Sequence, residues 1–179
     1  MKPVSHSQTT ITELMIPSYA NFGGKIHGGI LLSLMDKVAY VCAAKHASTY
    51  CVTVSIDGVE FLQPVEVGQL VSLHASVNYV GKSSMVVGIK VMAENIKTGH
   101  KKHTNTSYFT MVAKGDDGKA CEVPELVLEN NEDIRRFLEA IKRRELKGNY
   151  KTELANEKTR MQVEENLHLL EHERCVLKL

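Results

Sequence analysis

The sequence has little excess charge of either sign and no long apolar run. Across 179 residues, 22 basic residues balance 21 acidic ones, and a net charge of +1 gives no reason to expect a nucleic-acid partner or a membrane. No apolar segment approaches the roughly 20 residues that a membrane-spanning helix needs. The first ten residues, MKPVSHSQTT, lack the apolar centre of an export signal, so we expect a cytoplasmic protein.

Cysteine is scarce, and the motifs of several enzyme classes are absent. The chain has four scattered cysteines with no CxxC pair, which favours reduced thiols over disulfides. None of the eight histidines belongs to an HExxH motif or to a Cys/His metal spacing, so we expect no metal site. A GxSxG nucleophile motif is also missing.

The chain contains one long apolar segment that is typical of a helix, followed by segments typical of strands. Residues 27–47 contain no proline and are apolar on every side of a helical projection, which predicts a helix wrapped by other structure. One side of the projected helix contains Ile30, Leu31, Leu34, Val38, Val41 and Cys42. The other side contains Leu32, Ala39 and Ala43. Strands are predicted at residues 9–16, 50–64, 71–79, 85–93 and 103–113. The pattern predicts an α+β fold in which an antiparallel sheet curls around the helix.

The composition changes after Pro124. Residues 131–147 are predicted to form a helix, capped by Asn131 and broken by Gly148, with a stripe of Ile134, Phe137, Leu138 and Ile141. Residues 151–179 are charged, with apolar residues near helical spacing, and predict a second amphipathic helix. We therefore expect a domain of residues 1–125, a helix of residues 126–148 packed on it, and a charged helical tail of residues 149–179.

Asp36 is the one acidic residue in the predicted helix of residues 27–47. An unpaired carboxylate buried there would cost several kcal/mol. Asp36 therefore lies either on an exposed part of the helix, as most aspartates do, or at a pocket where it acts as a general base or nucleophile. The pattern alone leaves both interpretations open.

His27, Gly28 and Gly29 mark the start of this helix, where backbone N–H groups lack helical partners. Such amides can hold a carbonyl oxygen as it becomes an oxyanion, although two glycines can equally serve tight packing. Asp36 follows about two turns later, roughly 10 Å along the axis, too far to share one atom with these amides. A second chain, or the preceding loop with Asn21, must close such a site; the ordinary role of Asn21 would be to stabilise a turn.

Basic residues occur in two predicted turns, GKSS at 81–84 and KTGHKKH at 97–103. Solvated turn residues are the usual explanation, and phosphate binding is the alternative. The basic run is too short, and lacks the interleaved aromatic residues, to indicate nucleic-acid binding.

Three segments together resemble a known family: PSYANFGGKIHGGILLSLMDKVAYVCAAKH, VTVSIDGVEFLQPVEVGQLV and GKSSMVVGIKVMAENIKTGHKKHTNTSYFTMVA. They resemble the hotdog-fold acyl-CoA thioesterases, and most closely the cytosolic acyl-CoA hydrolase group. The resemblance covers about residues 8–146 in order. It implies the hotdog fold, a long central helix wrapped by an antiparallel sheet, here with a C-terminal helical extension.

The resemblance also implies an activity and its residues. The family hydrolyses fatty acyl-CoA to free fatty acid and coenzyme A at sites between subunits, so an acyl-CoA substrate is expected. Asp36, in the motif LMD, would be catalytic together with Asn21 of the other subunit. The amides of Gly28 and Gly29, next to His27, would hold the thioester carbonyl.

Coenzyme A would bind at the two basic turns, with its groups placed near Gly81, Lys82, Ser83, Ser84, Lys101 and Lys102. It belongs to the substrate, so no separate cofactor is expected. The resemblance further implies a homodimer of hotdogs and a hexamer of three dimers. A non-catalytic acyl-CoA-binding or regulatory protein on the same fold is the alternative, and a thioester dehydratase fits less well because His27 precedes the helix. The presence of both Asn21 and Asp36 favours the hydrolase.

Overall fold

The computed structural model describes residues 1–178 and divides the chain into two compact units, Met1–Ala140 and Ile141–Leu179. The elements, in chain order, are β1 (Lys2–Pro3), α1 (Val4–Ser7), β2 (Thr9–Leu14), the 3₁₀ turn η1 (Pro17–Tyr19), α2 (Gly28–Ala47), β3 (Tyr50–Ile56), β4 (Gln69–Val80), β5 (Ser84–Asn95), β6 (Lys101–Lys114), β7 (Leu126–Val127), α3 (Asn131–Arg160), α4 (Val163–Asn166) and the 3₁₀ turn η2 (Leu167–Leu170). No helix among the described residues is long and apolar enough to cross a membrane.

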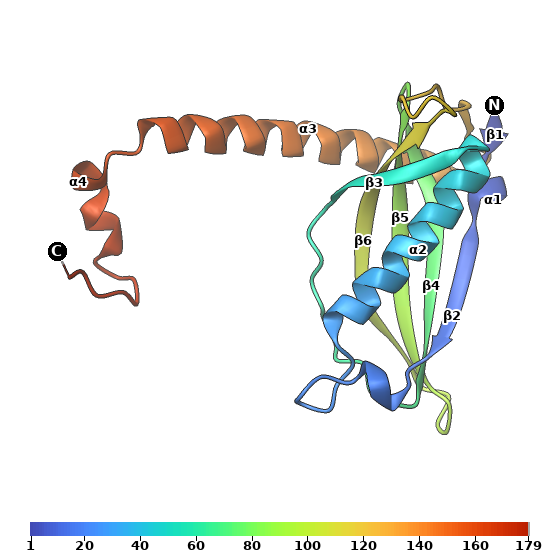
Figure 1. Ribbon diagram of the computed structural model, residues 1–179, viewed down its shortest axis with the longest axis horizontal. Helices are drawn as coiled ribbons and strands as arrows, with labels where there is room; N and C mark the ends of the chain where they lie inside the picture. The colour runs from blue at the N-terminus through green and yellow to red at the C-terminus, as the bar shows by residue number, and fades with distance from the viewer. Residues whose placement is uncertain (179) are drawn as a thin grey trace. The chain divides into compact units, whose positions relative to one another are not determined.

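The first unit is built on a five-stranded antiparallel sheet with the strand order β2-β4-β5-β6-β3. The sheet curls around α2, which contacts every one of its strands (Figure 1). Alternation places one set of side chains of β4 and β5 against α2, including Leu73, Val77 and Ile89, each almost fully buried. This confirms the predicted α+β hotdog architecture. Because β2 and β3 are the two outer strands, each has one edge with no partner strand within the described chain.

Helix α2 has 20 residues and begins and ends where the sequence predicts. The imidazole of His27 caps its start, and Ser48 ends it in the left-handed conformation with φ 58°. The buried side contains Leu34, Met35, Val38, Ala39, Cys42 and Ala43. The sheet wraps the helix as predicted but leaves Tyr40 and Val41 of the single chain 39% and 38% exposed. A single sheet can cover only one side of a helix, and here the other side stays open.

The segment after β3 differs from its prediction. Only Tyr50–Ile56 forms a strand, whereas residues 57–64 follow an irregular path beside β6. Asp57 N–H donates to the Tyr108 carbonyl, and Leu62 N–H donates to the Thr104 carbonyl, both at 2.9 Å. These bonds hold the segment against the sheet without a regular ladder.

Helix α3 departs from the prediction in its cap, in the apolar residues that it buries and in its length. The cap is Asn130, whose Oδ1 accepts the Asp133 N–H at 3.0 Å, while the Asp133 carboxylate accepts from Asn130 Nδ2 at 3.0 Å. Of the predicted stripe, Ile134 and Leu138 are 44% and 59% exposed, whereas Phe137 stacks on Tyr79 of β4 with ring centroids 4.9 Å apart. The stripe is therefore only partly covered.

Gly148 does not end α3, which continues for 30 residues to Arg160. One glycine costs only about 1 kcal/mol in a helix, which its neighbours can offset. The predicted helix of residues 151–179 is therefore replaced by the end of α3 and by the short α4 and η2, and residue 179 lies outside the described residues. The expected boundaries after residues 125 and 148 differ from the division into units, which falls within α3 after Ala140.

Candidate active site

Asp36 lies on the exposed side of α2, next to β3. The Thr53 hydroxyl on β3 donates to Asp36 Oδ1 at 2.6 Å, and the same hydroxyl lies 3.2 Å from the Met111 sulfur on β6. One carboxylate oxygen is thus held by a charge-assisted hydrogen bond. The second oxygen, Oδ2, accepts no hydrogen bond from residues 1–178 and is therefore available to accept a proton.

Asn21 organises the loop before α2. Its Oδ1 accepts the N–H of Gly23 at 2.9 Å and of Lys25 at 3.1 Å, while its backbone N–H donates to the Lys25 carbonyl at 2.7 Å. Because two backbone donors occupy Oδ1, the side-chain orientation is fixed and Nδ2 is left as a hydrogen-bond donor. The turn role and the functional role predicted for Asn21 are therefore compatible in one residue.

The start of α2 offers fewer free amides than the sequence implied. The Gly29 N–H already donates to His27 Nδ1 at 2.9 Å, so of the two glycine amides only that of Gly28 has no acceptor among the described residues. A ring nitrogen that accepts carries no hydrogen, so neutral His27 has its hydrogen on Nε2. The geometry therefore leaves the Gly28 amide, and not that of Gly29, as a candidate donor to a carbonyl oxygen.

The Phe61 ring lies close to Gly28. A Cβ on Gly28 would lie 3.2 Å from the Phe61 ring, which the irregular segment after β3 brings over the helix start. Phe61 is itself 46% exposed, as is the neighbouring Leu62 at 56%. An apolar surface therefore borders the donors at the start of α2.

The two groups of functional side chains do not converge within one chain. Asp36 follows Gly29 by two turns of α2, about 10 Å along the axis. The outer strand β3 beside Asp36 shows an inverted pattern, since Val54 and Ile56 are 54% and 44% exposed while Thr53 is half-buried. Exposed apolar residues on an unpaired strand edge are typical of a surface that a second chain covers.

The residues predicted to bind coenzyme A lie at opposite ends of the sheet. The turn of Gly81, Lys82, Ser83 and Ser84 precedes β5, whereas Lys101 and Lys102 follow the other end of this 12-residue strand, roughly 40 Å away. Lys102 Nζ donates to the Pro64 carbonyl at 2.5 Å, and Lys101 pairs with Glu94 at 3.3 Å. One chain does not bring these residues into a single site.

Thr53 is the functional side chain that the sequence analysis missed. Its position inside a strand of Val and Ile residues made it look like an ordinary strand former. The available signal was the alternation at the start of β3, which places Cys51 and Thr53 on the side that faces the helix, opposite the buried Ala113 and Met111 of β6. A hydroxyl on the inner side of an apolar strand needs a hydrogen-bond partner, and the helix offers Asp36.

Comparisons with known proteins agree with this geometry. A sequence model described as the thioesterase superfamily matches residues 23–100. Protein VdlD of Helicobacter pylori is 48% identical over 75% of this chain and 76% of its own length. An uncharacterized acyl-CoA thioester hydrolase, YkhA of Bacillus subtilis, is 36% identical over 81% of this chain and 84% of its own. The cytosolic acyl coenzyme A thioester hydrolase of Rattus norvegicus is 32% identical over 76% of this chain but only 36% of its own length.

Solved structures give the same result. An acyl-CoA hydrolase from Bacillus cereus has a TM-score of 0.80 at 32% identity, over 90% of this chain and 98% of its own. A hexameric acyl-CoA thioesterase has a TM-score of 0.80 at 36% identity, over 83% and 95%. An acyl-CoA hydrolase from Staphylococcus aureus, in complex with butyryl coenzyme A and coenzyme A, has a TM-score of 0.78 at 29% identity, over 86% and 94%.

The Staphylococcus aureus structures include three alanine mutants, in which an asparagine, an aspartate or a threonine is replaced. The spacing along the chain between these three residues equals the spacing of Asn21, Asp36 and Thr53 here. The same three residue types at the same separations therefore occur in both chains.

Proposed function

This chain belongs to the thioesterase superfamily, and on that basis we propose that it hydrolyses fatty acyl-CoA to a free fatty acid and coenzyme A. The observation that carries the proposal is the Asp36 carboxylate held by Thr53 on an exposed side of α2. The second support is the fixed orientation of Asn21, which leaves an amide donor beside the start of that helix.

The chemistry follows from these groups. The Asn21 Nδ2 group and the Gly28 amide donate hydrogen bonds to the thioester carbonyl oxygen and stabilise the negative charge that develops on it. The unoccupied oxygen of Asp36 takes a proton from water, which attacks the carbonyl carbon. The bond between that carbon and sulfur breaks, and the proton passes to the thiolate of coenzyme A. The products are a fatty acid and a free thiol.

A second copy of the chain completes the site. The unpaired edge of β3, with its exposed Val54 and Ile56, offers a strand edge for a partner, and the exposed Tyr40 and Val41 of α2 would be covered with it. Across such an interface, Asp36 of one chain meets the Asn21 loop of the other, which removes the separation along α2. Three such dimers would form a hexamer, a state that the similar hexameric thioesterase supports.

We extend the proposal to the location of the protein. The rat relative is named as a cytosolic enzyme, which supports a cytosolic place for this chain. The two basic turns, which lie apart in one chain, remain proposed contacts for coenzyme A only if different chains of the assembly contribute them.

The activity is tested by release of free thiol from acyl-CoAs of increasing chain length. Wild-type protein is expected to turn over at least one of them, and Asp36→Asn is expected to lower kcat by about a thousandfold or more, as loss of a base and its charge requires. Binding of acyl-CoA without thiol release would instead identify a binding protein.

The shared site is tested by mixing two inactive variants, Asp36→Ala and Asn21→Ala, after reversible dissociation. If each site takes one residue from each chain, half of the random dimers are mixed and each holds one intact site, so about a quarter of wild-type activity returns. A site contained in one chain would give no recovery. Wild-type protein carried through the same dissociation is the control.

A further inference from the structure

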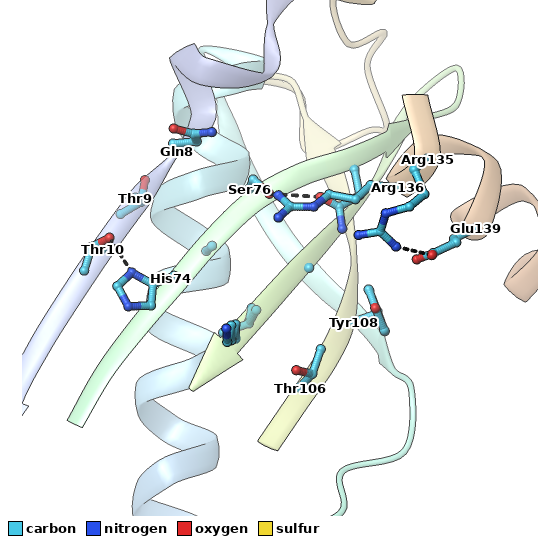
Figure 2. A pocket seen from close by; sticks show the side chains of 15 residues that line it. Gln8, Thr9, Thr10, His74, Ser76, Thr106, Tyr108, Arg135, Arg136 and Glu139 are labelled. Carbon is cyan, nitrogen blue, oxygen red and sulfur yellow. Dashed lines mark hydrogen bonds and ion pairs between the residues drawn. The ribbon is translucent and has the colours of Figure 1, made fainter. Parts of the chain in front are cut away.

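A cleft of about 400 Å³ opens on the sheet face opposite α2 (Figure 2). Neither Asp36 nor Asn21 lines it. Its floor is a row of register partners across four strands, from Thr10 on β2 through His74 on β4 and Lys90 on β5 to Thr106 on β6. One wall is the first turns of α3, which contribute Arg135, Arg136 and Glu139. All these residues belong to the first compact unit.

Gly88 shapes the floor of this cleft. In the register it lies between Ser76 and Tyr108, two residues before Lys90. A Cβ at this position would lie 2.2 Å from Asn78 Nδ2 and 3.3 Å from the Tyr108 ring. The missing side chain therefore provides the space in which the Asn78 amide lies across the sheet.

A chain of hydrogen bonds links α3 to that amide. Arg136 donates through one guanidinium nitrogen to Ser76 Oγ at 3.3 Å, and Ser76 Oγ donates to Asn78 Oδ1 at 2.9 Å. Ser76 and Asn78 are only 6% and 5% exposed. Because Oδ1 is the acceptor, Nδ2 is the donor, and it has no acceptor among the described residues. An acceptor bound in the cleft, which Asn78 lines, would pair with this donor.

Two cationic side chains that line the cleft, Lys90 and Arg136, have N–H groups without an acceptor in the described chain. The Lys90 ammonium forms no ion pair within residues 1–178. Arg136 uses one nitrogen on Glu132 and one on Ser76, so its remaining NH₂ group has no acceptor in that part of the chain. Lys90 lies two residues from Gly88 on the same side of β5, about 7 Å along the strand, which its flexible side chain can span.

The charges of the cleft leave a positive excess. Arg135 pairs with both Glu132 and Glu139, and Arg136 shares Glu132 (Figure 2 shows the contact with Glu139). Three cations, those of Lys90, Arg135 and Arg136, thus face two carboxylates. An anion entering the cleft would gain an ammonium, a guanidinium and an amide from three different elements.

We propose that this cleft binds a small organic phosphate, whose phosphate group is held by Lys90, Arg136 and Asn78. Donors from three elements, β5, α3 and β4, line this cleft, and a tetrahedral group with three oxygens can accept from all three, whereas a planar carboxylate has two oxygens. The volume exceeds that of a phosphate ion and falls in the range of small-molecule sites. The hydroxyls of Thr10 and Thr106, at the two ends of the floor, suit a hydroxylated carbon skeleton.

The test is calorimetric titration of the assembled full-length protein with ribose 5-phosphate at low salt. We expect saturable binding with a Kd below about 1 mM, and no binding of ribose. Lys90→Gln is expected to weaken binding at least about tenfold, and the isosteric Asn78→Asp, which replaces a donor with a negative charge, to weaken it further. Lys97→Gln, the same charge change in the exposed turn between β5 and β6, is the matched control and should change Kd less than twofold.

Several results would overturn the proposal. Absence of saturable binding of ribose 5-phosphate to the wild-type protein excludes the site. Affinity equal to that of wild type in both Lys90→Gln and Asn78→Asp also excludes it. Tighter binding of citrate excludes the phosphate class. Competition by saturating coenzyme A would assign the cleft to the phosphates of the substrate, so unchanged affinity in its presence is required. Thiol release by Lys90→Gln should equal that of wild type, which checks its fold independently.

Discussion

The hydrogen bond from Thr53 to Asp36 gives the sharpest test of the proposed mechanism. Thr53→Val removes the hydroxyl and keeps the branched shape that β3 packs against β6. The carboxylate then loses the donor at 2.6 Å that fixes its Oδ1, while Asp36 itself remains. We therefore expect a defect in the chemical step with little effect on substrate binding.

The size of the effect follows from the nature of the bond. A hydrogen bond to a charged group contributes about 1.5–3 kcal/mol, and each 1.36 kcal/mol corresponds to a factor of ten in rate. If that free energy is lost mainly in the transition state, kcat falls about tenfold to a hundredfold and KM changes less than threefold. Thr53→Ser keeps the hydroxyl and should retain most of the activity.

Steady-state thiol release provides the assay, and two controls separate the cause. Thr12→Val removes a comparable hydroxyl, 3.0 Å from Ser72 Oγ, at the opposite edge of the sheet and should leave kcat unchanged. Because Thr53 acts through Asp36, adding Thr53→Val to Asp36→Asn should cause no further loss. Wild-type kcat in Thr53→Val, or fully additive losses in the double variant, would refute the positioning role.

Three further predictions concern the loop, the long helix and a buried histidine. Asn21→Asp keeps an oxygen for the Gly23 and Lys25 amides but loses the Nδ2 donor, so kcat should fall at least tenfold while Tm changes by no more than about 2 °C; a large drop in Tm would mean that the loop itself had been lost. Gly148→Ala in α3 should slow amide hydrogen exchange around that position about fivefold and Gly148→Pro should accelerate it, whereas equal exchange in both would contradict a continuous helix. Burial lowers the pKa of His46 below its ordinary 6.5, so the unfolded chain takes up a proton first; the unfolding free energy should be fully present above pH 6.5 and decline as the pH falls below it, with a shallower decline in His46→Gln measured by urea denaturation.

The sequence was a good guide where local chemistry decides the outcome. The apolar run without proline predicts α2 to within a residue, because capping and helix propensity act over neighbouring positions. Alternation predicts the strands β2, β4, β5 and β6 for the same reason. Asp36 attracted attention because a carboxylate in an apolar helix needs an explanation, and the match of its flanking residues to the thioesterases supplied one.

Contacts between distant parts of the chain decided the rest. Thr53 became a functional residue only when β3 was placed beside α2, and His27 was found to occupy the Gly29 amide only through the geometry of the cap. The two basic turns looked equivalent in sequence, yet the length of β5 separates them. Asn78, Gly88 and Arg136 meet across the sheet although no pattern along the chain connects them.

By itself, the sequence determined the elements, the family resemblance and the catalytic candidates Asp36 and Asn21, because periodicity, capping and motifs depend on residues close together in the chain. Only the tertiary structure decided which donors remain available, that one chain leaves the site open beside an unpaired strand, and that a second cleft gathers unpartnered donors on the outer face of the sheet. Those properties depend on which side chains the fold brings within hydrogen-bond distance, and spacing along the chain does not specify that.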